Sequence, residues 1–328
     1  MMTHFFILAL FESIFQYTHR PEITREKGIE IAIFRGLLVK KGMKTYDTHT
    51  LAYSSCPNDT FIFKAIARQL IPVAPFDFKI SMADVETLNQ EAARETHDIT
   101  KLSFAALGRL LDTYALLRTG SALGRGCGPL LISRPHQDLA SAGLRPVVAV
   151  PGLGTTAYFL FRFYLADQFP DLSPEILPMP FEQIMPAVAQ GRAHAGVIIH
   201  EGRFVYADQG MALCRDLGEW WEEKTGHPIP LGCIAVKRSL GADIGLGVER
   251  LIGESIDHAF AHPRAGADYI REHAQEMEEA VLQKHISLYV NQYSRELGKE
   301  GEAAVRAFFD YAVEAGLMAP VSLPLFVG

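Results

Sequence analysis

The segment Ala193–Phe204, A-H-A-G-V-I-I-H-E-G-R-F, constrains the fold of this 328-residue chain more than any other. Residues Ala195–Ile199 form a short apolar run with β-branched members, and Gly202 follows soon after it. Such a run predicts a buried strand of a parallel sheet covered on both faces. In open α/β sheets the ligand crevice lies beyond the carboxyl ends of the strands. We therefore expect His200, the first residue after the run, to reach such a crevice.

The His200 position has two interpretations, which this segment alone does not separate. A histidine at a strand end can also be a packing residue, because fold position by itself does not establish function. Glu201 comes next and is a candidate for orienting His200, but adjacent strand residues point to opposite faces, which weighs against that role. The choice depends on what the other strand ends carry.

Two strand ends in the first half of the chain carry polar side chains. The predicted strand Thr50–Tyr53 runs into S-S-C-P-N-D-T at residues 54–60, where Asn58 and Asp59 precede a helix. A second strand ends in Lys101–Ser103, directly before another helix. These residue types are typical of helix starts, so a capped turn and a surface lysine are the alternative interpretations. A lysine beside a helix start is nevertheless well placed to meet an anion.

The strongest anion-binding pattern lies near the middle of the chain. The predicted strand Pro146–Val150 is followed by G-L-G-T-T at residues 152–156 and by a helix over Ala157–Gln168. Glycines let a ligand approach the backbone, Thr155 and Thr156 can donate from their hydroxyls, and a helix N-terminus favours negative charge. No Gly-Lys-Ser/Thr occurs here, which excludes a Walker loop and favours a carboxylate or another small oxyanion.

The pattern Gly124-x-Gly126-x-Gly128 has the spacing of a dinucleotide-binding loop but not its context. The strand Leu130–Ser133 follows it, whereas a dinucleotide loop opens a helix. We interpret it as a close-packed hinge or wall segment, where the backbone must approach another group. Arg125 within it either points into a cleft or pairs with an acid, and the sequence leaves both open.

The chain length predicts two domains, at roughly 150 residues per domain. We expect residues 1–42 to be a poorly ordered extension or the product of an over-long start site. One α/β lobe is expected over 43–140 with 238–328, because the helical end of the chain packs most economically on the first unit. The second lobe is expected over 141–237. This two-lobed α/β arrangement, with a ligand cleft between the lobes, is similar to type II periplasmic-binding-protein-like folds.

The apolar stretch Phe5–Tyr17 predicts neither a transmembrane helix nor a signal peptide. Glu12 interrupts it, and a spanning helix needs about 20 apolar residues. It lacks the basic start of a signal peptide, and no clear cleavage site follows. A weak membrane-surface helix is the alternative.

Composition excludes several classes of partner. The net charge is −7 and no long Lys/Arg run occurs, which argues against nucleic acid and an anionic membrane surface. The four cysteines are far apart and form no C-x-x-C pair, which argues against a zinc site and favours a reduced, cytoplasmic location. The histidines at 258, 262, 273 and 285 form no H-x₃-H pair with a matching acid, so we interpret them as surface or packing residues.

Five segments together resemble a known family. They are S-S-C-P-N-D-T-F-I-F, D-I-T-K-L-S-F, A-L-G-R-G-C-G-P-L-L, P-G-L-G-T-T-A and A-G-V-I-I-H-E-G-R-F, in this order. In sequence and spacing they resemble the menaquinone biosynthesis family of 1,4-dihydroxy-6-naphthoate synthases, which acts in the futalosine route. The resemblance spans residues 46–320 and leaves residues 1–42 out.

This resemblance implies a two-lobed fold and the cleavage of cyclic dehypoxanthinyl futalosine to the dihydroxynaphthoate, with no metal and no organic cofactor. It implies that His200 matches the family's base. Residues that match the family's substrate-contacting segments, together with two from the first junction, complete the predicted site: Lys101, Leu102, Ser103, Thr155, Thr156, Asn58 and Asp59.

The residues agree with that chemistry. Thr155 and Thr156 at a helix start suit the carboxylate of the implied substrate, and an imidazole with a pKa near 6.5 is a natural base at neutral pH. We expect His200 to abstract a proton and begin carbon–carbon cleavage. The cleavage expels a small sugar-derived fragment and lets the bicyclic ring aromatise.

Two other functions remain open at this point. One is a non-catalytic protein of the same fold that binds a small carboxylate, and the other is a chorismate dehydratase of the same pathway. A base at the cleft weighs against mere capture, and the segment I-I-H-E-G-R-F favours the lyase over the dehydratase. The expected partner is a small-molecule carboxylate, with no nucleic acid and no stable membrane insertion. The oligomeric state is open, with a homodimer among the options.

Overall fold

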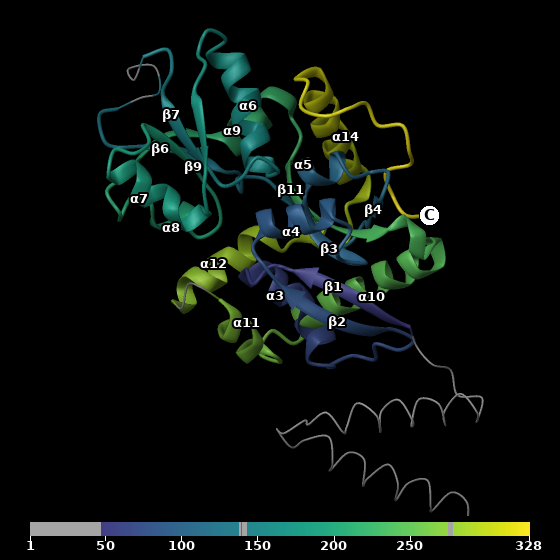
Figure 1. The fold of residues 1–328 in the computed structure, drawn as a ribbon. Coiled ribbons are helices and arrows are strands. Elements are labelled where there is room, and N and C mark those ends of the chain that lie inside the picture. Colours follow the sequence, from purple (N-terminus) through teal and green to yellow (C-terminus); the bar gives the residue numbers. More distant parts are fainter. Residues whose placement is uncertain (1–46, 138, 140–142, 275–277) are drawn as a thin grey trace, which may run out of the picture. The chain divides into compact units, whose positions relative to one another are not determined.

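The computed structural model describes residues 47–137, 139, 143–274 and 278–328. The chain divides into two units, Met1–Asp47 and Thr48–Gly328, and the elements described below belong to the second. The extension expected over residues 1–42 lies outside the described residues. Figure 1 labels most helices and strands of the second unit.

The first sheet contains six strands, and Figure 1 labels β1, β2, β3, β4 and β11. Their order is β2-β1-β3-β11-β4, and β5 pairs with β11 off this path. β1 is parallel to β2 and β3, whereas β11 is antiparallel to β3, β4 and β5. The strands are β1 (Thr48–Tyr53), β2 (Asp77–Met82), β3 (Ile99–Ser103), β4 (Tyr114–Leu116), β5 (Ala122–Gly124) and β11 (Ile229–Lys237).

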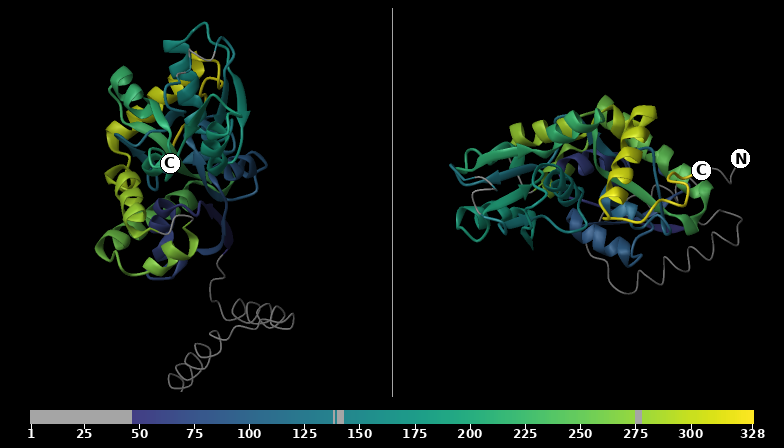
Figure 2. Two further views of the ribbon diagram at one scale, coloured as in Figure 1. Left: turned by 90° about the vertical axis from the view of Figure 1, so that its left-hand side faces the viewer. Right: turned by 90° about the horizontal axis from the view of Figure 1, so that it is seen from above.

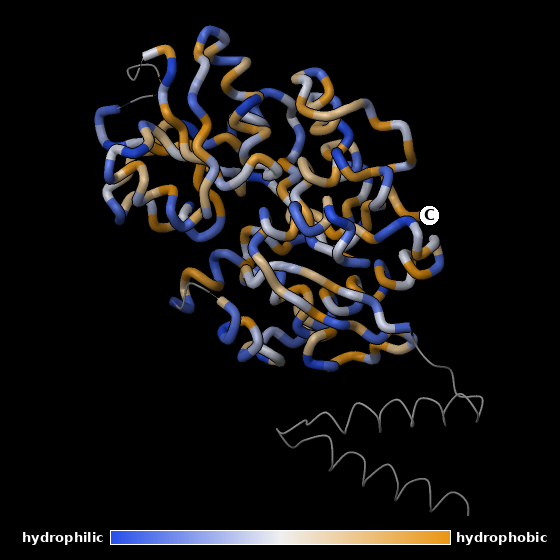
Figure 3. The backbone as a smooth tube through the Cα atoms, viewed as in Figure 1, coloured by the Kyte–Doolittle hydropathy of each residue, from blue (hydrophilic) through white to orange (hydrophobic). Residues whose placement is uncertain are grey.

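The second sheet contains five strands in the order β10-β6-β9-β7-β8. β9 is buried over its whole length and pairs in parallel with β7, which confirms the buried strand predicted before His200; its other neighbour, β6, is antiparallel. Figure 3 shows apolar stretches along β7 and β9. The strands are β6 (Leu130–Ser133), β7 (Val147–Val150), β8 (Glu175–Pro178), β9 (Ala195–Ile198) and β10 (Ala212–Asp216).

The helices pack against both sheets. α10 packs along α3, and α14 contacts β11, α5 and α6, so the C-terminal helices cover elements of the first sheet (Figure 2). The helices are α3 (Pro57–Ala67), α4 (Val85–Ala93), α5 (Phe104–Gly108), α6 (Thr156–Gln168), α7 (Ile184–Ala189), α8 (Gly202–Val205), α9 (Leu217–Thr225), α10 (Ala242–Ala261), α11 (Ala267–His273), α12 (Glu279–Tyr289), α13 (Gln292–Arg295) and α14 (Gly298–Glu314).

Side chains at three helix starts explain why the chain turns from strand to helix there. Asp84 caps α4 by accepting hydrogen bonds from the N–H groups of Glu86 and Thr87. Thr155 caps α6 through its hydroxyl, and Pro57 occupies the first turn of α3. These residues satisfy N–H groups that a helix leaves unpaired, or remove one of them.

Two strands depart from the expected lobe bounds of 43–140 with 238–328 and 141–237. β6 lies before residue 141 but pairs with β9 and β10 of the second sheet. β11 lies within 141–237 but pairs with three strands of the first sheet. All four residues of β6 are buried. The chain therefore crosses between the sheets at residues 125–129 and again at residues 217–228.

The two crossing segments touch at Gly128 and Gly218. A Cβ at Gly128 would lie 2.3 Å from the Cα of Gly218, so a side chain there would require the backbone to move. The N–H of Leu217 also donates to the carbonyl of Pro129 at 3.0 Å. The close approach confirms the interpretation of this glycine segment as close-packed.

Candidate active site

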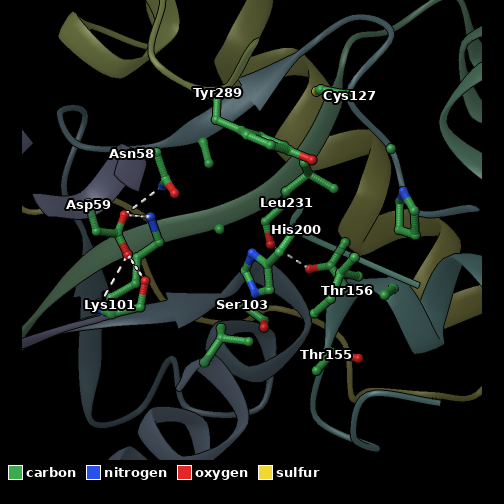
Figure 4. A pocket seen from close by; sticks show the side chains of 18 of the residues that line it. Asn58, Asp59, Lys101, Ser103, Cys127, Thr155, Thr156, His200, Leu231 and Tyr289 are labelled. Atoms are coloured by element: carbon green, nitrogen blue, oxygen red, sulfur yellow. Dashed lines mark hydrogen bonds and ion pairs between the residues drawn. The ribbon is translucent and has the colours of Figure 1, made fainter. Parts of the chain in front are cut away.

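A cleft is lined by residues from elements of both sheets (Figure 4). The first junction, β3 and β11 contribute from the first sheet; the turn before α6 and the end of β9 contribute from the second, and α12 adds two side chains. The predicted site residues in its lining are Asn58, Asp59, Lys101, Ser103, Thr155, Thr156 and His200. The four junctions singled out in the sequence therefore meet at one cavity.

A buried ion pair lies at one end of the cleft (Figure 4). The Nζ of Lys101 donates to Asp59 Oδ1 at 2.6 Å, and the two side chains are 5% and 1% exposed. The other oxygen of Asp59 accepts from the hydroxyl of Ser54 at 2.6 Å. Such burial is tolerated because the charges are paired and hydrogen-bonded. Among the described residues Lys101 Nζ donates only to Asp59, so further N–H donors are available to a ligand.

The side-chain amide of Asn58 connects this ion pair to His285. Its Nδ2 donates to Asp59 Oδ1 at 2.8 Å, so its Oδ1 accepts from the Nε2–H of His285 at 3.0 Å. Burial lowers the pKa of His285 to about 3, with the positive charges of His200 and Lys101 adding to the effect. The ring is therefore neutral at physiological pH. Its Nδ1 has no hydrogen-bond partner among the described residues.

His200 lies two residues after the end of β9 at Ile198 and has a left-handed backbone, with φ of +56°. Its ring lies nearly parallel to that of His285, with the ring centroids 6.3 Å apart. It packs edge-to-face with the ring of Phe181, with the centroids 4.9 Å apart. Its Nδ1 lies 3.6 Å from the Sγ of Cys56, the residue before α3. The expectation that His200 reaches the cleft agrees with its place in the lining.

The surroundings of His200 raise its pKa above the ordinary imidazole value. Burial alone would lower the pKa, but the interaction with Cys56, with smaller effects of the carboxylates of Glu201 and Asp59, raises it to about 9. The sequence-based expectation of an ordinary value near 6.5 therefore differs from the structure. The difference arises because Cys56 comes from another sheet and is 144 residues away in the chain.

The two threonines before and at the start of α6 use their hydroxyls within the protein. Thr155 donates to the carbonyl of Gly152 at 2.8 Å and accepts from the N–H of Tyr158. Thr156 donates to the carbonyl of Leu231 on β11 at 2.8 Å. Within the described residues, the N–H groups of Thr156 and Ala157 donate to no protein acceptor. At the start of α6, the groups available to bind an anion are therefore these two backbone N–H donors.

Three other predicted positions have different surroundings. Leu102 is fully buried in the hydrophobic core and does not line the cleft. Glu201 is partly buried and lines a small neighbouring cavity together with Cys56. Arg125, left open in the sequence, donates to Glu300 at 3.0 Å and lies near Glu222 on the surface.

Several residues of the site were not predicted, and three of them contact predicted site residues. His285 and Cys56 flank His200, and Asn89 on α4 contacts Ser103. The sequence offers a weak signal for Cys56, which lies in the first junction. It offers none for His285 or Asn89, because both lie inside ordinary helices.

The described ranges contain no group of three or more His, Cys, Asp or Glu side chains arranged to hold a metal ion. Within the same ranges, no helix is both long and apolar enough to cross a membrane.

The fold and the cleft define a two-lobed protein of the type II periplasmic-binding-protein-like class. A crystal structure of a protein from Archaeoglobus fulgidus matches with a TM-score of 0.75 at 28% identity, covering 83% of this chain and 98% of that one. The periplasmic aliphatic sulphonate binding protein of Escherichia coli shares the fold with a TM-score of 0.60 at 11% identity, covering 87% of this chain and 94% of that one.

Within this class, the chain belongs to the menaquinone biosynthesis family, whose model matches residues 49–314. A 1,4-dihydroxy-6-naphthoate synthase of Streptomyces coelicolor is 46% identical over 273 residues, covering 83% of this chain and 95% of the relative. The enzyme of the same name from Thermus thermophilus is 45% identical over 278 residues, covering 84% and 98%. The family expected from the five segments is confirmed.

Proposed function

We propose that this chain is a carbon–carbon lyase that converts cyclic dehypoxanthinyl futalosine to 1,4-dihydroxy-6-naphthoate in menaquinone biosynthesis. The name of two relatives that match over nearly their whole length supports this activity. The single structural observation that carries the mechanism is the position of His200 in a cleft that also holds a buried lysine and a free helix start. These relatives favour neither alternative function, the non-catalytic protein that binds a small carboxylate or the chorismate dehydratase.

The carboxylate of the substrate binds where three kinds of donor line the cleft. Lys101 supplies ammonium N–H groups beyond the one that it donates to Asp59. The N–H groups of Thr156 and Ala157 lie at the positive end of the α6 dipole. Ser103 adds a hydroxyl from the end of β3. In this arrangement Thr155 and Thr156 contribute through backbone geometry, because their hydroxyls are engaged elsewhere.

His200 is the base that starts the cleavage. It takes a proton from the sugar-derived part of the substrate, the carbon–carbon bond breaks, and the ring system gains the electrons that make it aromatic. A pKa of about 9 makes the neutral ring a strong base but a minor species at pH 7. Activity that depends on the neutral form therefore rises with pH up to about the pKa of His200 in the free enzyme.

The proposal is tested by assaying the purified protein with the cyclic futalosine derivative and following naphthoate formation. Replacing His200 should lower kcat by about 10²–10⁴-fold, the usual contribution of a general base. Because the backbone at this position is left-handed, which asparagine tolerates better than most residues, His200→Asn is the appropriate variant.

The His200→Asn protein should still bind the naphthoate product with nearly unchanged affinity, as measured by calorimetry. Full turnover in that variant would exclude His200 as the base. A wild-type protein that binds the substrate without converting it, or that instead dehydrates chorismate, would contradict the proposed activity.

We also propose revised lobes, residues 48–124 with 229–328 and residues 130–216, joined by the two crossing segments. Sheet membership supports these bounds. A cytoplasmic location is supported by the thiols, since none of the four cysteines forms a disulfide and reduced thiols are typical of the cytosol.

A further inference from the structure

Asn89 makes two hydrogen bonds to one residue of the cleft, Ser103. Its Oδ1 accepts from the N–H of Ser103 at 3.0 Å, and its Nδ2 donates to the hydroxyl oxygen of Ser103 at 3.1 Å. The Ser103 oxygen is therefore an acceptor toward Asn89, and its own proton must point elsewhere. No described residue accepts that proton, and Ser103 lines the cleft. The amide of Asn89 thus leaves the Ser103 O–H free to donate to a ligand.

The same amide reaches the turn before α6, which belongs to the other sheet. The Nδ2 of Asn89 lies 3.3 Å from the carbonyl of Gly154 and 3.1 Å from Glu86 Oε2. The N–H of Gly154 in turn donates to Glu86 Oε1 at 3.4 Å.

Two glycines of this turn let the Glu86 side chain of α4 pack directly against the backbone. A Cβ at Gly152 would lie 2.4 Å from Glu86 Cδ, and one at Gly154 would lie 3.0 Å from Glu86 Oε2. The sequence predicts that these glycines let a ligand approach the backbone. In the structure they also let the second sheet's turn approach α4 of the first.

We propose that Asn89 is a positioning residue for the substrate's carboxylate: it orients the Ser103 hydroxyl as a donor into the cleft and ties that hydroxyl to the turn that presents the free N–H groups of α6. Donors from both sheets are then aligned by one buried amide, which is 5% exposed. This inference rests on the proposed function, since it concerns the carboxylate-binding end of the same cleft. Asn89 acts through Ser103 and Gly154 rather than by touching the reacting atoms.

Asn89→Asp tests the proposal with almost no change in shape. The carboxylate keeps the acceptor for the Ser103 N–H but replaces the Nδ2 donor with a second acceptor. The Ser103 O–H then turns to residue 89 and is lost to the ligand. A hydrogen bond to a charged group contributes enough that its loss weakens binding about 10–100-fold. We expect kcat/KM to fall by that factor through KM, with kcat changed less than about threefold.

A binding assay separates this inference from the activity itself. The probes are 2-naphthoate and its methyl ester, measured by calorimetry with wild type, Asn89→Asp, Ser103→Ala and the double variant. Wild type should prefer the acid over the ester, and Asn89→Asp should lose most of that preference. Because Asn89 acts through Ser103, Asn89→Asp should weaken binding of the acid much less in the Ser103→Ala background than in the wild-type background, where its effect includes the loss of the Ser103 donor.

Thr87→Ala is the matched control, because Thr87 lies on the same helix and bonds to Asp84 outside the cleft. It should leave the acid preference and kcat/KM unchanged. An unchanged acid preference in Asn89→Asp, or losses that multiply in the double variant, would overturn the positioning role. A wild type that shows the acid preference but no turnover would instead contradict the proposed function alone.

Discussion

The pKa values of the two histidines in the cleft are shifted in opposite directions from the ordinary imidazole value. His200 lies beside Cys56 and near two carboxylates, which raise its pKa to about 9. His285 is 1% exposed, and burial lowers its pKa to about 3. The two nearly parallel rings, 6.3 Å apart, therefore carry one positive charge between them at neutral pH, and it resides on His200. Pairs whose environments separate their pKa values in this way are typical of acid–base sites.

Replacing Cys56 should move the pH dependence of the reaction. In Cys56→Ser the largest effect that raises the pKa of His200 is weakened while burial still lowers it. The neutral, active form of His200 then becomes populated at lower pH. We expect the acid limb of kcat/KM, near pH 9 in wild type, to shift down by at least one unit, as measured between pH 5.5 and 9.5.

Cys214→Ser on β10, outside the cleft, is the control and should keep the wild-type profile. If the acid limb of Cys56→Ser stays near pH 9, the proton affinity of His200 has another origin.

Replacing His285 should change how stability depends on pH. Its pKa is depressed in the folded protein, so below about pH 6.5 the unfolded chain binds a proton that the folded chain does not, and the free energy of unfolding falls as pH falls. From pH 7 to pH 5 this one residue contributes a loss of about 2 kcal/mol. In His285→Gln that part of the loss disappears.

Urea unfolding at pH 7 and pH 5 measures this difference. His262→Gln, at an exposed position, should retain the wild-type dependence. Equal losses of stability in wild type and His285→Gln would show that the ring is not held neutral by the fold.

At the scale of elements, the sequence predicted strands and junctions better than helix ends. β6 has the predicted bounds, Leu130–Ser133, because a short apolar run between a proline and polar residues carries its own limits. The helix predicted directly after Ser103 is short and ends at Gly108. Apolar spacing continues through Leu110 and Leu111, so the pattern alone does not show where hydrogen bonding stops.

The candidate site was predictable to the extent that it depends on strand ends. His200, Lys101 and Ser103 follow or end buried strands, and the general rule for open sheets places such residues at a crevice. The partners of these residues were not predictable, because they depend on packing between distant segments. His285 meets Asn58 across 227 residues of sequence, and Thr156 meets Leu231 across 75.

At the scale of the whole second unit, two sheets are joined by segments that cross at Gly128 and Gly218. Gly128→Ala would place a methyl group against backbone atoms at 2.3 and 2.4 Å, which a side-chain rotation cannot relieve. We expect the free energy of unfolding to fall by about 2–3 kcal/mol, the upper range for overpacking, as measured by chemical denaturation.

Gly126→Ala controls for the change from glycine in the same segment. No atom lies within 4 Å of a Cβ there, and the cost is that of a left-handed backbone, about 1 kcal/mol. A loss at Gly128 no larger than that at Gly126 would show that the crossing can separate freely.

The buried Lys101–Asp59 pair also bears on how an acidic substrate arrives. The ammonium group is enclosed and neutralised, so it projects little field into solvent, while the chain as a whole carries a charge of −7. An approaching carboxylate therefore meets net repulsion until it enters the cleft. Added salt screens that repulsion over about 10 Å at 0.1 M but hardly reaches the enclosed pair. Raising the ionic strength should therefore increase the association rate of the substrate and leave the dissociation rate of the bound acid almost unchanged.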